Sequence, residues 1–145
     1  MRIVVLLIVA GGFVACQNNS GHATAEQAKV DTLLKEVIKG HDVGMAKMKA
    51  LRTAIAGTQA KLDSLNALPA SKVDAAYQQA LIDLQEDLNY AEYGMNQWMN
   101  EFKLDSAEDN SELRLQYLES EKEKVFKVRD NILNGLARAD SLLKK

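Results

Sequence analysis

The strongest constraint on the fold is the spacing of apolar residues between Tyr77 and Phe102. The apolar side chains there recur at alternating intervals of four and three residues, at Tyr77, Leu81, Leu84, Leu88, Ala91, Met95, Trp98 and Phe102. This spacing draws one apolar stripe along an α-helix and is typical of the buried positions of antiparallel bundle helices. The single proline and eight glycines among 145 residues also favour long helices over a strand-and-turn fold. We therefore predict a helix over residues 71–102, with Ser71 and Asp74 available as its cap.

A longer helix is predicted before it, over residues 24–68. Thr24 and Gln27 match a capping box, and Pro69 ends the pattern. Its stripe repeats every seven residues, at Leu34, His41, Met48, Ile55 and Leu62. Ile38 and Met45 fill a second seam, which then drifts to Leu51, Thr58 and Leu65. Gly40 and Gly44 disfavour a helix interior, so they predict either the close approach of a neighbouring helix or a local kink.

The third predicted helix covers residues 111–143 and starts near the turn-forming Asp109 and Asn110. Glu121 is the only ionisable residue in its two seams, and the rest of the run 119–124 is expected to be a solvated charged face. Three amphipathic helices with short connections predict an all-α, up-down-up, antiparallel three-helix bundle with coiled-coil-like packing over residues 24–145. A dimerising coiled-coil rod presents the same heptads and is the alternative, although Pro69 and residues 103–110 favour the folded-back chain.

Folding the first two helices back at Pro69 places His41 level with Met99, and Met45 level with Met95. A second hairpin centred near residue 107 places residues 115–118 level with Trp98, and Glu121 one turn further toward Met95. The predicted layer combines sulfur, aromatic and ionisable side chains: His41, Met45, Met48, Met95, Trp98, Phe102, Tyr117 and Glu121.

Two interpretations of this layer are open. Thioethers with one imidazole suit Cu(I), and a His–Met pair across a bundle is one way to hold haem iron. The candidate ligands are His41, Met45, Met48, Met95 and Met99. Alternatively, methionine fills gaps beside Trp98, and a neutral His41 hydrogen-bonds Tyr117, Glu121 or a water. Methionine at seam spacing ordinarily packs a core, so we favour the second interpretation and expect no metal or cofactor.

The first sixteen residues predict a location for the protein. After Arg2, residues 3–15 form an uncharged, mostly apolar run that is shorter than the ~20 residues of a membrane span. The small residues before Cys16 resemble the lipobox of bacterial lipoproteins, with Phe13 in place of the usual Leu or Val. In such proteins the cysteine becomes the lipid-bearing first residue of the mature chain. We therefore predict a signal peptide over residues 1–15, and a lipidated Cys16 with a flexible tether over residues 16–23.

Charge and motifs exclude several functions. Eighteen basic and twenty acidic residues give a net charge of -2, which offers no basic surface for nucleic acid. The sequence contains no glycine-rich phosphate loop, nucleophile elbow, paired-histidine zinc helix or Cys–His arrangement. An acid–base pair of His41 and Glu121 is the remaining catalytic hypothesis, and it lacks a nucleophile. We expect that the protein is not an enzyme.

Short motifs in all three predicted helices resemble one protein family. They are Glu36-Val37, His41-Asp42, Met45 and Lys47-Met48, then Met95, Trp98-Met99 and Phe102, then Tyr117-Leu118, Glu121-Lys122 and Lys124-Val125. The chain is thereby similar to small Bacteroidota lipoproteins commonly labelled "viral A-type inclusion protein", a family without an established activity. The resemblance implies a lipid-anchored helical protein. Ala46 stands where relatives often have proline, which implies a straighter first helix, and Asn100 stands where a histidine can occur.

Together these features predict a lipoprotein of the bacterial outer membrane that faces the periplasm, since residues 17–20 lack the acidic run of surface-export signals in this bacterial group. Its expected task is that of a structural or protein-interaction module, as a monomer or weak homo-oligomer. Its expected partners are the membrane, through the lipid on Cys16, and an envelope protein, but not nucleic acid. A periplasmic carrier of Cu(I) or haem is the alternative function.

Overall fold

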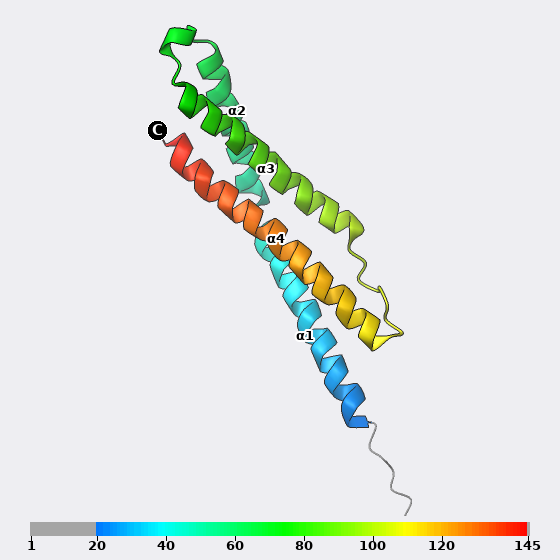
Figure 1. Ribbon diagram of the computed structural model, residues 1–145. Coiled ribbons are helices and arrows are strands. Elements are labelled where there is room, and N and C mark those ends of the chain that lie inside the picture. The colour runs from blue at the N-terminus through cyan, green and yellow to red at the C-terminus, as the bar shows by residue number, and fades with distance from the viewer. Residues whose placement is uncertain (1–19, 145) are drawn as a thin grey trace, which may run out of the picture.

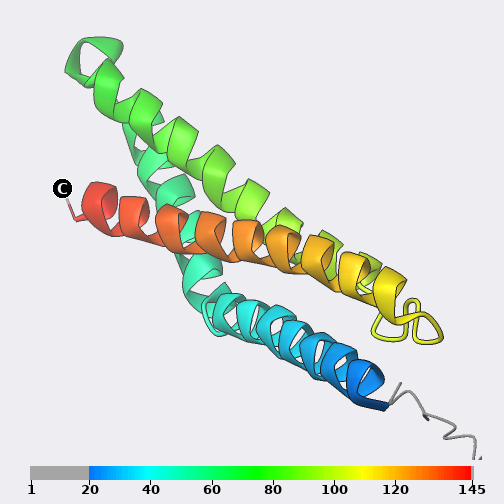
Figure 2. The same ribbon diagram turned by 60° about the horizontal axis from the view of Figure 1, so that its bottom comes forward.

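The computed structural model describes the backbone of residues 20–144 and the side chains of residues 25–144, and it shows three helical arms packed together (Figures 1 and 2). The first arm consists of α1 (Ser20–Met45) and α2 (Met48–Asn66), and a 3-10 turn, η1 (Ala70–Lys72), follows. The second and third arms are α3 (Ala75–Glu101) and α4 (Ser111–Leu143). The arms run up, down and up, so α1 and α4 are parallel to each other (Figure 1). The predicted all-α, folded-back bundle is confirmed.

Side-chain caps fix the starts of the last two helices. The Asp74 carboxylate accepts two backbone N–H bonds from the next turn, at 3.0 and 3.1 Å. The Asn110 side chain likewise accepts the N–H of Leu113 at 3.0 Å. These bonds satisfy N–H groups that a first helical turn leaves without partners. The predicted start at residue 71 is too early, because Asp74 is the cap of α3, whereas the predicted start at residue 111 is confirmed.

Helix α1 starts earlier than the sequence predicted. Residues 20–23 are helical, although they were assigned to the flexible tether and the helix was expected from residue 24. The helix therefore takes up the last four tether residues. The predicted signal peptide and Cys16 lie outside the described residues. None of the helices in the described part of the chain is long and apolar enough to cross a membrane.

The first arm bends at residues 46–47, so the single helix predicted over residues 24–68 is wrong. The Lys47 N–H donates to the Gly44 carbonyl at 2.9 Å, three residues back, and the regular pattern resumes where the Leu51 N–H donates to the Lys47 carbonyl. A glycine and a locally tightened turn are ordinary causes of a helix kink. Below the bend α1 packs mainly on α4, and above it α2 packs mainly on α3. The first arm thus changes neighbours at the kink, and it is not the straighter helix implied by Ala46.

Two buried glycines bring α1 close to its neighbours. A Cβ atom at Gly40 would lie 2.7 Å from the Phe126 ring, closer than real Cβ contacts. A Cβ atom at Gly44 would collide with the end of the Met95 side chain. A close approach and a kink were predicted as alternatives at these glycines, and both occur.

This close approach decides which side of the first arm is buried. Val37, Gly44, Leu51 and Thr58 repeat every seven residues and are buried. Ile38 and Met45, predicted in that seam, are instead 37% and 38% exposed. Below the bend the predicted seam was one position off, because the two glycines bring α4 close on their own side of the helix. Above the bend its predicted continuation at Leu51 and Thr58 is buried and is confirmed.

The connection between α3 and α4 is held by a buried arginine. Arg114 is 6% exposed, and its guanidinium donates to the carbonyls of Leu104 and, at 2.6 Å, of Ser106. Ala107 has a φ of 57°, a left-handed conformation that few non-glycine residues adopt. Residues 102–110 therefore run on beyond the end of α3 before they turn back, rather than forming a tight turn centred at residue 107 (Figure 1).

This extension moves the second hairpin out of its predicted register. Gly94 faces Val128, and Gly135 faces Leu88. At this register the residue level with Trp98 lies near Lys124, about two helical turns beyond the predicted residues 115–118. The predicted position of Glu121 level with Met95 is wrong for the same reason.

We predict opposite effects for two glycine substitutions in the first arm. Gly44→Val should lower the free energy of unfolding by about 1–3 kcal/mol, because the added side chain overpacks the core against Met95. Gly57→Ala should raise it by up to about 1 kcal/mol, because alanine favours the helix. A Cβ at Gly57 would meet only Leu143, at an ordinary 3.4 Å. Urea unfolding measures both, and equal effects would contradict the role of Gly44 in close packing.

A second stability prediction concerns the α3–α4 connection. Arg114→Ala should lower the free energy of unfolding by about 2–3 kcal/mol, because two carbonyls lose a charged donor in a largely buried position. The matched control is Arg52→Ala, which removes an ion pair to Glu92 from a side chain that is 62% exposed. The control should cost less than about 1 kcal/mol. Equal losses in chemical denaturation would show that Arg114 does not hold the connection.

Candidate functional site

Four rings of the predicted layer form a continuous stack that links α1, α3 and α4. The His41 and Trp98 ring centroids lie 5.5 Å apart, within one residue of the predicted pairing of His41 with Met99. Trp98 stacks on Phe102 at 4.8 Å, and Phe102 faces Tyr117 at 6.1 Å. Such stacked aromatic pairs add to the stability gained from burial alone. The structure therefore brings these four residues of the predicted layer together.

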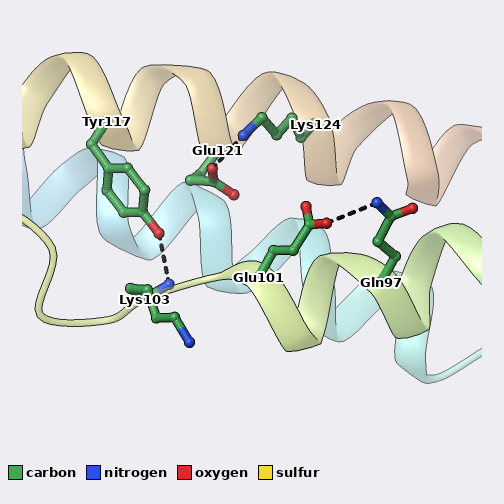
Figure 3. Close-up of polar contacts among 6 residues, drawn as sticks. All are labelled: Gln97, Glu101, Lys103, Tyr117, Glu121 and Lys124. Atoms are coloured by element: carbon green, nitrogen blue, oxygen red, sulfur yellow. Dashed lines mark hydrogen bonds and ion pairs between the residues drawn. The ribbon is translucent and has the colours of Figure 1, made fainter.

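The polar ends of this stack point to nearby partners. The His41 Nδ1 atom lies 3.0 Å from the Asp42 carboxylate, on the surface, rather than against Tyr117 or Glu121 as predicted. The Tyr117 hydroxyl accepts the backbone N–H of Lys103 at 2.7 Å, just after the end of α3 (Figure 3). The stack thus joins the first arm to the α3–α4 connection.

The four methionines of the described residues do not share one environment. Met95 is fully buried and Met48 is 4% exposed, whereas Met45 and Met99 are each 38% exposed. Met45 was predicted in the core layer, and this is wrong, because the close packing at Gly44 turns the neighbouring side chain outward. Among the described residues, no three or more His, Cys, Asp or Glu side chains are grouped to hold a metal ion.

Glu121 is a buried carboxylate held by one lysine. The residue is 4% exposed, and Lys124 donates to its Oε1 atom at 2.7 Å (Figure 3). Burying a carboxylate is costly unless it is paired, so this contact explains how Glu121 is accommodated. The same hydrogen bond raises the pKa of Lys124, and desolvation opposes it. The sequence analysis expected the rest of residues 119–124 to form a solvated charged face. It did not predict that Lys124 pairs with the buried Glu121.

Beside this ion pair, α3 and α4 line an open hollow of about 210 Å³. We refer to it as the α3–α4 hollow, and its lining includes Gly94, Trp98, Glu101, Lys124, Lys127 and Asn131. One more lining residue, Gln97, donates from its side-chain amide to Glu101 at 2.8 Å (Figure 3). The sequence analysis did not find this feature. Its one signal was a glycine in the interior of an otherwise well-patterned helix.

The hollow brings a tryptophan, two lysines and a carboxylate to one concave surface. Pockets that bind small ligands combine an apolar wall with a few convergent polar groups. Trp98 contributes little surface to it, since it is 5% exposed and stacks on Phe102.

No protein-family model, curated protein or solved structure matches the chain. The similarity to small Bacteroidota lipoproteins therefore stays a prediction.

The raised pKa of Lys124 predicts a loss of stability at alkaline pH. A lysine pKa that folding raises above its usual value of 10.5 stabilises the protein while the amine is protonated, and this contribution is lost as the pH rises through the folded pKa. We expect the free energy of unfolding to fall above about pH 10.5. The decline should be smaller in Lys124→Gln and unchanged in Lys35→Gln, an exposed control on α1. Identical pH profiles of wild type and Lys124→Gln, measured by denaturant unfolding, would contradict this prediction.

Proposed function

We propose that the chain is a lipoprotein anchored through Cys16, whose helical bundle acts as a non-enzymatic binding module of the cell envelope. The observation that carries the proposal is the apolar run over residues 3–15 that ends in small residues before Cys16. The proposed site of attachment is the outer membrane, with the bundle facing the periplasm.

The geometry of the bundle is compatible with attachment at one end. Cys16 precedes the start of α1 by four residues, a distance of at most about 14 Å. The start of α1 lies at the same end of the bundle as the α3–α4 connection (Figure 2). Helix α4, with 33 residues, then extends about 50 Å toward the opposite end. An anchored bundle of this shape would present its long sides to soluble partners.

The ionisable groups support binding rather than catalysis. His41 and Glu121, the acid–base pair considered from the sequence, contact different partners, Asp42 and Lys124. With both groups engaged elsewhere, their geometry does not support proton transfer between them. The exposed Met45 and Met99 likewise give the copper or haem carrier no assembled ligand set.

Lipid attachment can be tested by metabolic labelling with a palmitate analogue in a bacterial host. We expect the wild-type chain to carry the label and to sediment with membranes, because the thiol of Cys16 is the proposed attachment atom. The Cys16→Ala variant should lose the label entirely and lose membrane association. A matched control, Met45→Ala, changes an exposed residue of the bundle and should keep both properties.

Two results would contradict the proposal. One is the absence of label on the wild-type chain in a host that labels a known lipoprotein. The other is a Cys16→Ala variant that retains the label.

A further inference from the structure

A second open hollow lies between α3 and α4, further from the α3–α4 connection than the first. Its volume is about 420 Å³, and we refer to it as the Tyr90 hollow. Apart from Gly135, every lining residue has a polar side chain: Asp87, Tyr90, Lys127, Asn131, Asn134 and Arg138. Such a lining disfavours an acyl chain or an apolar helix, because its polar groups would lose their hydrogen bonds to water without gaining others. The ligand that matches it forms many hydrogen bonds.

The lining residues belong to two helix faces. On α4, the four polar side chains from Lys127 to Arg138 are spaced by four, three and four residues, which places them on one face of the helix. On α3, Asp87 and Tyr90 are three residues apart and share a face in the same way. The strip on α4 is about 16 Å long at 1.5 Å per residue. This length exceeds a single sugar ring, so it suits an oligomeric ligand.

Most polar groups of the Tyr90 hollow are available to a ligand. Among the described residues, no side-chain hydrogen bond engages Asn131, Asn134 or Lys127. Asp87 and Arg138 form an ion pair through one carboxylate oxygen and one guanidinium nitrogen. An amide both donates and accepts, and a guanidinium carries five donors. Donors and acceptors side by side match hydroxyl groups, since each hydroxyl also donates and accepts.

Tyr90 adds an exposed aromatic ring to these polar groups. The residue is 60% exposed, and it lines both the Tyr90 hollow and the α3–α4 hollow. The face of an aromatic ring carries negative charge density and attracts positively polarised C–H groups. A pyranose ring presents C–H groups on one face and hydroxyls around its rim. An exposed tyrosine beside amide, carboxylate and guanidinium groups is therefore complementary to a saccharide.

The charges in the hollow select among saccharides. Asp87 and Arg138 compensate each other, whereas the ion pairs found in the described part of the chain do not include Lys127. An ammonium group without a charged partner can bind a carboxylate through a charge-assisted hydrogen bond. A saccharide with a carboxylate thus matches the hollow better than a neutral one.

We propose that the Tyr90 hollow binds an oligosaccharide that contains a uronic acid, with the carboxylate at Lys127 and a sugar ring against Tyr90. The amides of Asn131 and Asn134 bond to hydroxyl groups of the ligand. An acidic peptide would also supply carboxylates, but it lacks the hydroxyl groups that these amides match. This assignment rests on the proposed binding role but not on the lipid, so it can fail while the anchoring test succeeds.

The test is saturation-transfer NMR on the full-length chain, purified in a detergent without a sugar head group. The probes are trigalacturonic acid, a hyaluronan tetrasaccharide and the methyl ester of each, which removes the charge but keeps the sugar. We expect saturable binding of at least one acid, with a dissociation constant between about 10 µM and 1 mM for a ligand of this size. Its ester should bind about two- to fivefold more weakly, the loss expected for one exposed charge pair.

Variants with matched controls separate the site from the rest of the surface. Tyr90→Ala should weaken binding about five- to tenfold through the loss of stacking. Its control is Tyr93→Ala, which removes a ring that is 61% exposed on the same helix but lines neither hollow, and it should bind like wild type. Lys127→Gln should bind the acid and its ester equally, whereas Lys35→Gln, an exposed lysine of α1, should keep the preference for the acid. Circular dichroism should show the same helix content in all four variants.

Each remaining outcome would overturn the proposal. These are the absence of binding by both acids, equal binding of acid and ester to the wild-type chain, and equal affinities of Tyr90→Ala and Tyr93→Ala. A preference for the acid that persists in Lys127→Gln would also overturn it. Triglutamate that binds as tightly as the acidic saccharide would indicate an unspecific anion surface instead of a saccharide site.

Discussion

The contact on which the rest of the bundle depends is the close approach of α1 to its neighbours at Gly40 and Gly44. Phe126 and Met95 occupy the space that side chains would fill at these two positions. Because interiors are close-packed, a gap or an overlap of one methyl group at such a contact is felt by the surrounding core. The bend at residues 46–47 follows directly above it, and there the first arm passes from α4 to α3. The fully buried Met95 lies beside this transition.

The bundle class and the first hairpin could be predicted because local signals determine them. Alternating spacing gave the apolar stripe of α3, and the proline and short connection after α2 left few ways to fold back. His41 therefore lies within one residue of its expected level. The second hairpin could not be placed in this way. Its connection is held by a buried guanidinium and a left-handed alanine, and neither the partners of Arg114 nor the conformation of Ala107 has a periodic signature.

The candidate site, like the fold, could be predicted only in part from the sequence. Hydrophobic periodicity identifies a helix face to within about one residue, and it gives no weight to glycine. It therefore placed Met45 in the core, although the packed side is that of Gly44. It also overlooked the α3–α4 hollow, whose lining includes Gly94. The aromatic stack was predictable because large rings at seam positions have few alternatives to mutual burial.

The parallel orientation of α1 and α4 has a mechanical consequence. Ser20 and Leu143 terminate these two helices at opposite ends of the bundle (Figure 1). Tension applied between these two points would slide the helices along each other, so it would load many side-chain contacts at once instead of peeling them apart in succession. A bundle connected in this manner resists stretching along its length better than it resists being opened from the side.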